Sequence, residues 1–448
     1  MPEPRPYAVH AALAGLASST AARFAALPWW AQVIAVFAAS RAVGFCIFAA
    51  AAYHQGVNPW FAPQPDYFRF VGIWDAGWYG RIIQDGYPSV LPRSESGAVQ
   101  ENAWAFYPVY PLLVKGLAAA SGLPWEAVAQ IVAVASGFGA ALIAYRLFRR
   151  AAEHATAMWG IAFLAFFPVS AILQVPYAEA LGLLMLAWAL LWVAERRYLA
   201  AMPVVVAMAL TRPIGVPFAL AVGGLFLVRL VANLSRDRGG PGALASASRT
   251  AGPQAGTAAG GPGALGGPAV GSGKQGTTAG GLARLGGLAV VSGAAALAWP
   301  AIAWAGTGEP TAYTETETVW RGGPLELFVP WAETGAYLFG PGIGTLAALV
   351  LVALLALAFT SARVRALGPE MQLWCAAYAF YLLAVLHPQT STFRMLLPLF
   401  PLALAAAALS RSRAYRWAVL GGFVLLEIVW VQWLWVWTPL PGGGDWPP

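Results

Sequence analysis

The chain has 448 residues, of which 59% are hydrophobic and only 10% charged, and its formal net charge is +7. About a quarter of the residues of a soluble domain are charged, so this composition excludes an ordinary water-soluble protein. The apolar runs are roughly 20 residues long and do not alternate with a period of two, which favours membrane-spanning helices over the strands of a barrel.

The spans are expected to begin after a short N-terminal arm. Residues 1–30 lack the basic-then-apolar layout of a cleaved signal peptide, so we interpret them as a cytoplasmic arm. The run at 106–121 contains two prolines and a lysine, and we expect it to lie at the membrane interface without crossing. About eleven other apolar runs predict spans near 31–53, 125–147, 156–174, 177–195, 199–211, 213–232, 286–305, 341–360, 370–387, 395–410 and 416–437.

The placement of basic residues predicts the direction of these spans. If 106–121 does not cross, only Arg212, Arg321 and Arg394 among the later basic residues lie opposite the N-terminus. The positive-inside rule then places the N-terminus in the cytoplasm and the loops 54–124 and 306–340 outside. The scarcity of lysine beside abundant alanine, glycine and arginine indicates a GC-rich genome, so we expect a bacterial plasma membrane protein.

A segment of low complexity divides the chain. Residues 233–285 are rich in glycine and alanine and have few large apolar side chains. Such a composition cannot bury enough surface to offset the entropy of ordering, so we expect a flexible cytoplasmic linker. It separates an N-terminal transmembrane part, 31–232, from a C-terminal part, 286–448.

Polar residues gather in the loops expected outside. The most informative segment is IWDAGWYGRIIQDGYP at 73–88, where helical spacing places Trp78, Ile82 and Ile83 on one apolar face. This predicts an interfacial helix with Asp75 near its start. The simpler alternatives are an N-cap for Asp75 and an aromatic belt for the tryptophans.

An ordered set of motifs resembles one enzyme family. The strings WDAGWYGRIIQDGYP and WAFYPVYPLL are followed by VPYAEALGLLMLAWALL, ALTRPIGVPFAL at 209–220 and TFRMLLPLFPLALA at 392–405. This set is similar to the PIG-V-like mannosyltransferases, which belong to the membrane glycosyltransferases of the GT-C fold. The chain departs from the eukaryotic relatives at Trp78, where they often have histidine, and this leaves the acceptor contacts open.

The resemblance implies an all-α, GT-C-like bundle that transfers mannose from a polyprenyl-phosphate donor on the outer face, with inversion. It implies that Asp75 is the catalytic base. A phosphate leaving group calls for arginine, and the candidates are Arg394 and Arg212. A snorkelling interfacial arginine is the alternative for Arg394, and a structural ion pair is the alternative for Glu179. The residues expected to line the site are Trp74, Trp78, Tyr79, Tyr107, Tyr177, Glu179 and His387.

The partners follow from the same reading. The acceptor is a glycolipid, a lipoglycan or a protein; membrane lipid is a partner and nucleic acid is not. The alternatives are a GT-C enzyme that uses another polyprenyl-phosphate sugar, and a lipid or solute transporter. Glu315 and Glu317 are weak candidates for a divalent ion, and we expect no required metal or other cofactor. We also expect Arg41 and Glu427, both deep in spans, to pair across the bundle.

Overall fold

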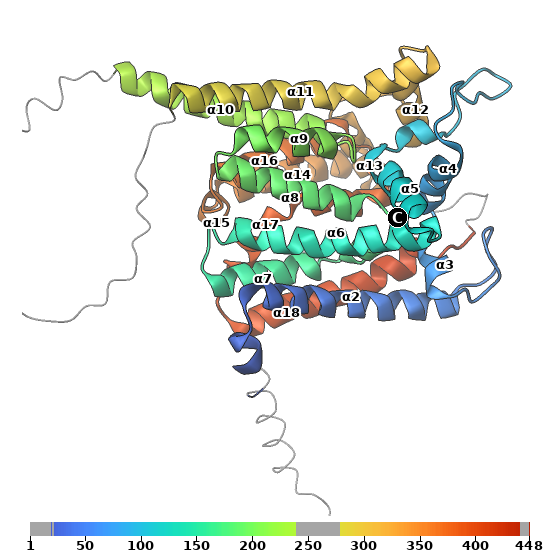
Figure 1. Cartoon of the computed structure of the whole chain (residues 1–448), viewed down its shortest axis with the longest axis horizontal. Helices are drawn as coiled ribbons and strands as arrows, with labels where there is room; N and C mark the ends of the chain where they lie inside the picture. The colour runs from blue at the N-terminus through green and yellow to red at the C-terminus, as the bar shows by residue number, and fades with distance from the viewer. Residues whose placement is uncertain (1–18, 20–21, 239–277, 440–447) are drawn as a thin grey trace, which may run out of the picture.

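The computed structural model describes residues 19, 22–238, 278–439 and 448 (Figure 1). In these residues the secondary structure is helical, and the only β contact is one isolated bridge between Arg93 and Val99. The helices that build the bundle lie side by side with roughly parallel axes. They are α2 (Trp29–His54), α6 (Trp125–Phe148), α7 (His154–Ala165), α8 (Glu179–Ala194), α9 (Tyr198–Ala209), α10 (Gly215–Arg238), α11 (Ala279–Thr307), α14 (Pro341–Thr360), α16 (Pro369–Val385), α17 (Pro401–Ala407) and α18 (Arg413–Trp430).

Shorter elements connect these helices. Several gather at one end of the bundle, on the right in Figure 1: α3 (Tyr67–Val71), α4 (Asp75–Asp85), the 3₁₀ turn η1 (Ala103–Ala105), α5 (Val109–Ser121), α12 (Ala312–Arg321) and α13 (Val329–Phe339). The short α15 (Ala362–Arg365) lies at the opposite end. The 3₁₀ segments η2 (Ser170–Gln174) and η4 (Thr390–Leu399) lie within the bundle, and the π-helical turn η5 (Val431–Trp435) extends α18.

The long apolar helices make this a helical integral membrane protein. By length and composition, six helices in the described part can cross a membrane: α2, α6, α10, α11, α14, and α18 with its π-helical turn. The pair η4 and α17, bent by 76°, adds a seventh if the two form one broken span. Each of the other predicted spans contains a shorter helix.

Two of the predicted spans are not continuous helices. The run expected at 156–174 is helical only to Ala165, because Pro168 lacks the amide that would continue the backbone ladder, and η2 follows. The run expected at 395–410 is broken where η4 meets α17, next to Pro398 and Pro401. At both breaks, side chains of other helices bind backbone carbonyls that the helix no longer uses: Arg41 at the first break, and Trp374 and Tyr378 at the second.

The run at 106–121 forms a short helix of 13 residues, and the expectation that it does not cross the membrane stays a prediction. Its helix, α5, packs against α4 and α6 at the end of the bundle that carries α3 and α4 (Figure 1). Both ends of the segment expected as a linker, 233–285, are helical, because α10 continues to Arg238 and α11 begins at Ala279. Residues 239–277 and most of the expected N-terminal arm lie outside the described residues.

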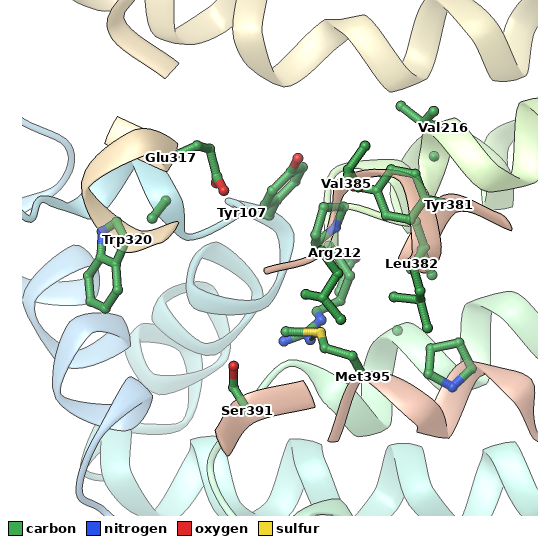
Figure 2. Close-up of a pocket in the computed structure, with 18 of the residues that line it drawn as sticks. Tyr107, Arg212, Val216, Glu317, Trp320, Tyr381, Leu382, Val385, Ser391 and Met395 are labelled. Atoms are coloured by element: carbon green, nitrogen blue, oxygen red, sulfur yellow. Dashed lines mark hydrogen bonds between the residues drawn. The ribbon is translucent and has the colours of Figure 1, made fainter. Parts of the chain in front are cut away.

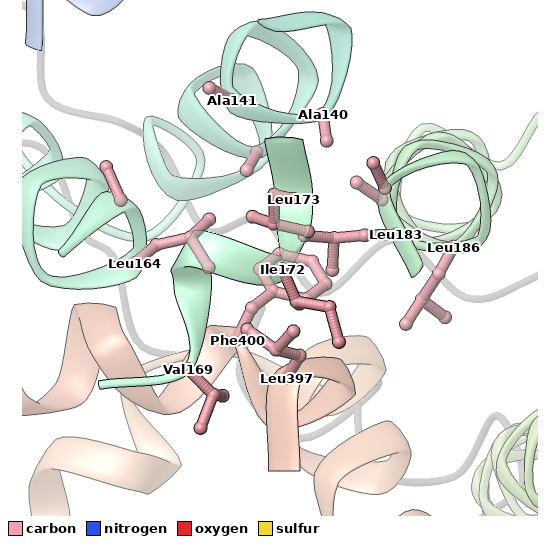
Figure 3. Close-up of a cluster of buried hydrophobic side chains, with 14 of the residues drawn as sticks. Ala140, Ala141, Leu164, Val169, Ile172, Leu173, Leu183, Leu186, Leu397 and Phe400 are labelled. Carbon is pink, nitrogen blue, oxygen red and sulfur yellow. The ribbon is translucent and has the colours of Figure 1, made fainter. Parts of the chain in front are cut away.

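The bundle core forms around η2. Figure 3 shows Ile172 and Leu173 of this segment in contact range of side chains from the helices around them. They are fully buried, as is Leu186 of α8. Small residues such as Ala140 and Ala141 let α6 approach closely, so the core fixes α8 and η4 relative to each other.

Basic side chains gather at the other end of the bundle. Arg146 ends α6, Arg196 and Arg197 lie between α8 and α9, and Arg363 and Arg365 lie in α15. The predicted site residues lie at the end that carries α4 and α12.

Candidate functional site

A cavity of about 730 Å³ lies where α4 and α12 meet the ends of α8, α10, α16 and the start of η4. Its walls bring together segments that are far apart in the sequence. Of the ten predicted site residues, seven line it: Asp75, Tyr79, Tyr107, Glu179, Arg212, His387 and Arg394. The cavity therefore brings together residues from each of the sequence motifs.

Four charged residues form one connected cluster on the cavity wall. Arg394 donates to the carboxylate of Asp75 and, at 3.1 Å, to Oε1 of Glu179. The same oxygen accepts from Nη1 of Arg212 at 2.8 Å. Two carboxylates thus balance two guanidinium groups, so the cluster is neutral when all four are ionised.

The cluster is largely withdrawn from the protein surface. Arg394 is 9% exposed and Glu179 is 6% exposed. One oxygen of Glu179 and Nε of Arg394 are buried without a hydrogen-bond partner, so the cluster keeps hydrogen-bonding capacity that the protein does not use. Arg394 is buried in the cluster and is not a snorkelling residue at the surface. Glu179 forms ion pairs with both arginines, which is the structural role given as its alternative.

The backbone around Asp75 is held by Tyr177. Trp74, the residue before α4, has φ 59° and ψ −123°, a conformation that is costly for a non-glycine residue. The Tyr177 hydroxyl accepts from the amide of Asp75 and donates to the carbonyl of Ile73, both at 3.1 Å. Asp75 is therefore not an N-cap. It is the first residue of α4, and its carboxylate faces Arg394.

Three predicted lining residues do not line the cavity. Tyr177 is fully buried beneath it, where its ring lies 5.7 Å from the Arg394 guanidinium. Trp74 directs its indole nitrogen to the carbonyl of Trp435, at 3.4 Å. Trp78 stacks on Phe106, with ring centroids 5.7 Å apart, so it supports the wall from behind. Trp74 and Trp78 therefore lie outside the cavity lining, contrary to expectation.

The opposite wall comes from α12, which holds none of the ten predicted site residues. Glu317, Trp320 and Arg321 line the cavity from this helix, and Figure 2 shows the carboxyl group of Glu317 directed toward Tyr107. Burial raises the pKa of Glu317, and the charge of Arg321 opposes this. The signal in the sequence was helical periodicity. Glu315 and Glu317 are two residues apart, so they lie on different faces of a helix and only one of them can face the cavity.

That periodicity also separates Glu315 from Glu317. Glu315 lies near Arg93, at 3.4 Å, and accepts from Thr311, whereas Glu317 faces the cavity. The two do not converge on one ion. In the described part of the chain, no group of three or more histidine, cysteine, aspartate or glutamate side chains is arranged to hold a metal.

One side of the cavity is apolar. Val216 and Leu297 line it from α10 and α11, and Leu325, Leu382 and Val385 line it from the α12–α13 connection and α16. Val216, Leu297 and Leu325 are 42%, 67% and 53% exposed, so this side reaches the outer surface of the bundle. A site with a charged centre and an apolar exit suits an amphiphile.

His387 lines the same cavity in an uncharged form. Burial lowers the pKa of its ring below 6.5, and the nearby positive charge of Arg321 lowers it further. The ring is therefore neutral at pH 7. Arg212 and Arg394, and not His387, supply the positive charge of the central cluster.

Arg41 and Glu427 do not pair, contrary to expectation. Arg41 donates to the carbonyls of Ser170 and Ala165, at 2.5 and 2.9 Å, where α7 and η2 leave carbonyls free. Glu427 is fully buried, and neither of its carboxyl oxygens has a hydrogen-bond partner. Cys46 and Cys375 are free; Cys375 is buried and Cys46 is exposed on α2.

Comparison with known proteins adds no name to this site. No protein-family model matches the chain, and no curated protein matches it. What the cavity can do therefore follows from its own residues.

Proposed function

We propose that this protein is a membrane glycosyltransferase that moves a sugar from a polyprenyl-phosphate donor to an acceptor hydroxyl. The observation that carries the proposal is the pairing of Asp75 with Arg394 on the wall of a cavity with an apolar exit. A base, a phosphate-binding cation and a place for a lipid chain then meet in one space. The motif resemblance to the PIG-V-like family favours mannose as the sugar and a GT-C-like fold.

The donor phosphate would bind at the two arginines. A guanidinium matches phosphate oxygens in two-point contact, and Arg212 and Arg394 are neighbours through Glu179. The prenyl chain would lie along the apolar side, past Val216 and Leu297, and reach the lipid there. This places the scissile sugar–phosphate bond next to Asp75.

Donor binding also has a consequence for Asp75. In the resting cluster its carboxylate is bound to Arg394, so that oxygen is not free to accept the proton of an acceptor hydroxyl. A phosphate that draws Arg394 toward itself adds one negative charge to a neutral cluster and releases the carboxylate. Asp75 is then free to accept that proton only when the donor is in place.

The transfer is a single displacement. The acceptor oxygen attacks the anomeric carbon, a new C–O bond forms, and the bond from that carbon to the phosphate oxygen breaks. The hydroxyl proton passes to Asp75, and polyprenyl phosphate leaves with the bond's electron pair beside Arg394 and Arg212. One displacement inverts the anomeric configuration.

The proposal includes a membrane orientation. The arginine-rich end of the bundle would face the cytoplasm, and the cavity end would face outward, as the positive-inside rule predicts. Eleven crossings, with α7, α8, α9, α16 and the η4–α17 pair as short or broken spans, would give this arrangement. The setting would be the plasma membrane of a bacterium.

The direct test is transfer by the purified protein. Polyprenyl phosphate carrying labelled mannose is incubated with the protein in lipid vesicles and with membrane glycolipid extracts as acceptor. We expect labelled glycolipid and free polyprenyl phosphate. Movement of intact donor across the vesicle membrane, without a new glycosidic bond, would replace this proposal with a transporter.

A further inference from the structure

Three carboxylates line the cavity, and they differ in how they are paired. Asp75 and Glu179 both bind arginines of the central cluster. Glu317 forms no ion pair within 4 Å among the described residues, and the protein offers it the hydroxyl of Tyr313 as a hydrogen-bonding neighbour. A partly buried carboxylate without an ion-pair partner, on the wall of a large cavity, keeps acceptor capacity for a ligand.

We propose that Glu317 binds hydroxyl groups of an uncharged acceptor glycan, and that it selects against anionic acceptors. This inference rests on the proposed glycosyl transfer. It assigns the α12 wall to the acceptor and the α10–α16 wall to the donor lipid.

The arrangement of the cavity supports this division. Figure 2 shows Glu317 and Trp320 on one side of Arg212, and Val216 and Leu382 on the other. A donor with its phosphate at the arginines and its chain on the apolar side leaves the α12 side free. An acceptor that enters along α12 would meet Glu317 before it reaches the anomeric carbon.

The chemistry of this wall suits an uncharged sugar. An ionised carboxylate only accepts hydrogen bonds, so it can bind two hydroxyl groups of one sugar ring. Tyr107 and Tyr313 stand nearby with their hydroxyls joined at 2.8 Å, and Tyr381 lines the same side. An acidic sugar would bring a second negative charge to Glu317 in a site with little water.

The helix that carries Glu317 is fixed in rotation. Thr316, the preceding residue, is fully buried, and its hydroxyl exchanges hydrogen bonds of 2.9 and 3.2 Å with the Asn102 side chain. Arg93 binds Glu315 on the outer face of α12 and Glu309 in the connection that precedes this helix. These contacts keep Glu317, and not Glu315, directed into the cavity.

The matched pair of variants is Glu317→Gln and Glu315→Gln, whose positions are two residues apart on the same helix. The probes are octyl mannoside, which is neutral, and its uronic acid counterpart, which is anionic. Binding is measured first, by protection of the purified protein against thermal unfolding in the absence of donor. Transfer of labelled mannose from the polyprenyl-phosphate donor to each probe is measured second.

We expect the wild type and Glu315→Gln to bind the neutral probe and to reject the anionic one. Glu317→Gln should bind the neutral probe about 10- to 100-fold more weakly, as for the loss of a hydrogen bond to a charged group, and should discriminate less between the probes. Glu317→Asp should recover part of the affinity.

Equal binding by Glu317→Gln and Glu315→Gln would overturn the role of Glu317, as would wild-type binding of the anionic probe as tight as that of the neutral one. Selective binding that depends on Glu317 but without transfer to either probe would instead count against glycosyl transfer, and would leave Glu317 as the glycan-binding residue.

Discussion

The hydroxyl of Tyr177 bridges the two peptide groups on either side of Trp74, accepting from the amide of Asp75 and donating to the carbonyl of Ile73. Trp74 has a positive φ, so this bridge stabilises a conformation that the backbone alone disfavours. The result is a helix that begins at Asp75 with its carboxylate toward Arg394. A buried tyrosine outside the cavity therefore positions the proposed base.

Tyr177→Phe removes this bridge and leaves two backbone groups without their partner. We expect the free energy of unfolding to fall by about 1–3 kcal/mol and the transfer rate to fall with it, because Asp75 loses its fixed position. Tyr110→Phe is the matched control, since its hydroxyl donates to the carbonyl of Ala129 away from the cavity. An equal loss of stability in both variants, with equal transfer rates, would show that Tyr177 has only a structural role.

Arg394→Lys tests the role of the guanidinium without removing the positive charge. The lysine still neutralises Asp75 and Glu179, so the protein should fold, but it cannot make two parallel bonds to a phosphate. We expect the KM for the lipid-phosphate donor to rise at least about 10-fold. Arg411→Lys, at an exposed pair with Glu153, should change nothing. A donor KM equal to that of the wild type would remove Arg394 from phosphate binding.

Gly182→Ala tests the position of Arg212. A methyl group at Gly182 would lie 2.9 Å from Cγ of Arg212, so the arginine side chain, which binds Glu179, must shift. We expect a folded protein with weaker donor binding. Gly139→Ala presses on Leu184 instead, at 3.1 Å, and is the control. The measurement is donor affinity in both variants, and the interpretation fails if the two lose affinity equally.

The pH dependence of stability should report Glu317. Burial raises its folded pKa above the ordinary 4.5, so its stabilising contribution is complete below pH 4.5 and is lost as pH rises through the folded pKa. Glu317→Gln stays uncharged throughout. Its melting temperature should match that of the wild type in acid and exceed it increasingly toward neutral pH. A difference between the two proteins that does not change with pH would contradict this.

The sequence predicted which segments form helices better than it predicted how they meet. Hydropathy located the long helices, and each predicted span contains a helix. It did not show that α7 ends at Ala165. The carbonyls freed by that break, at Ala165 and Ser170, bind Arg41, and this is why the expected pair with Glu427 does not form.

The candidate site shows the same division. Asp75, Glu179, Arg212 and Arg394 were found from motifs, and they form one cluster. The surroundings were not found, because the rotation of a helix depends on tertiary packing. Phe106 draws Trp78 behind the wall, and Asn102 fixes α12 so that Glu317 enters the cavity. Neither contact is visible in local spacing.

The central claim is that Asp75 acts as the base and is released when the donor draws Arg394 away. The most direct measurement compares Asp75→Asn with the wild type for two quantities, the rate of sugar transfer and the affinity for polyprenyl-phosphate mannose. We predict that transfer falls by about 10²- to 10⁴-fold, while donor affinity stays equal or increases because Arg394 is free for the phosphate. Transfer at the wild-type rate, or a loss of donor affinity that accounts for the whole loss of transfer, would contradict the claim.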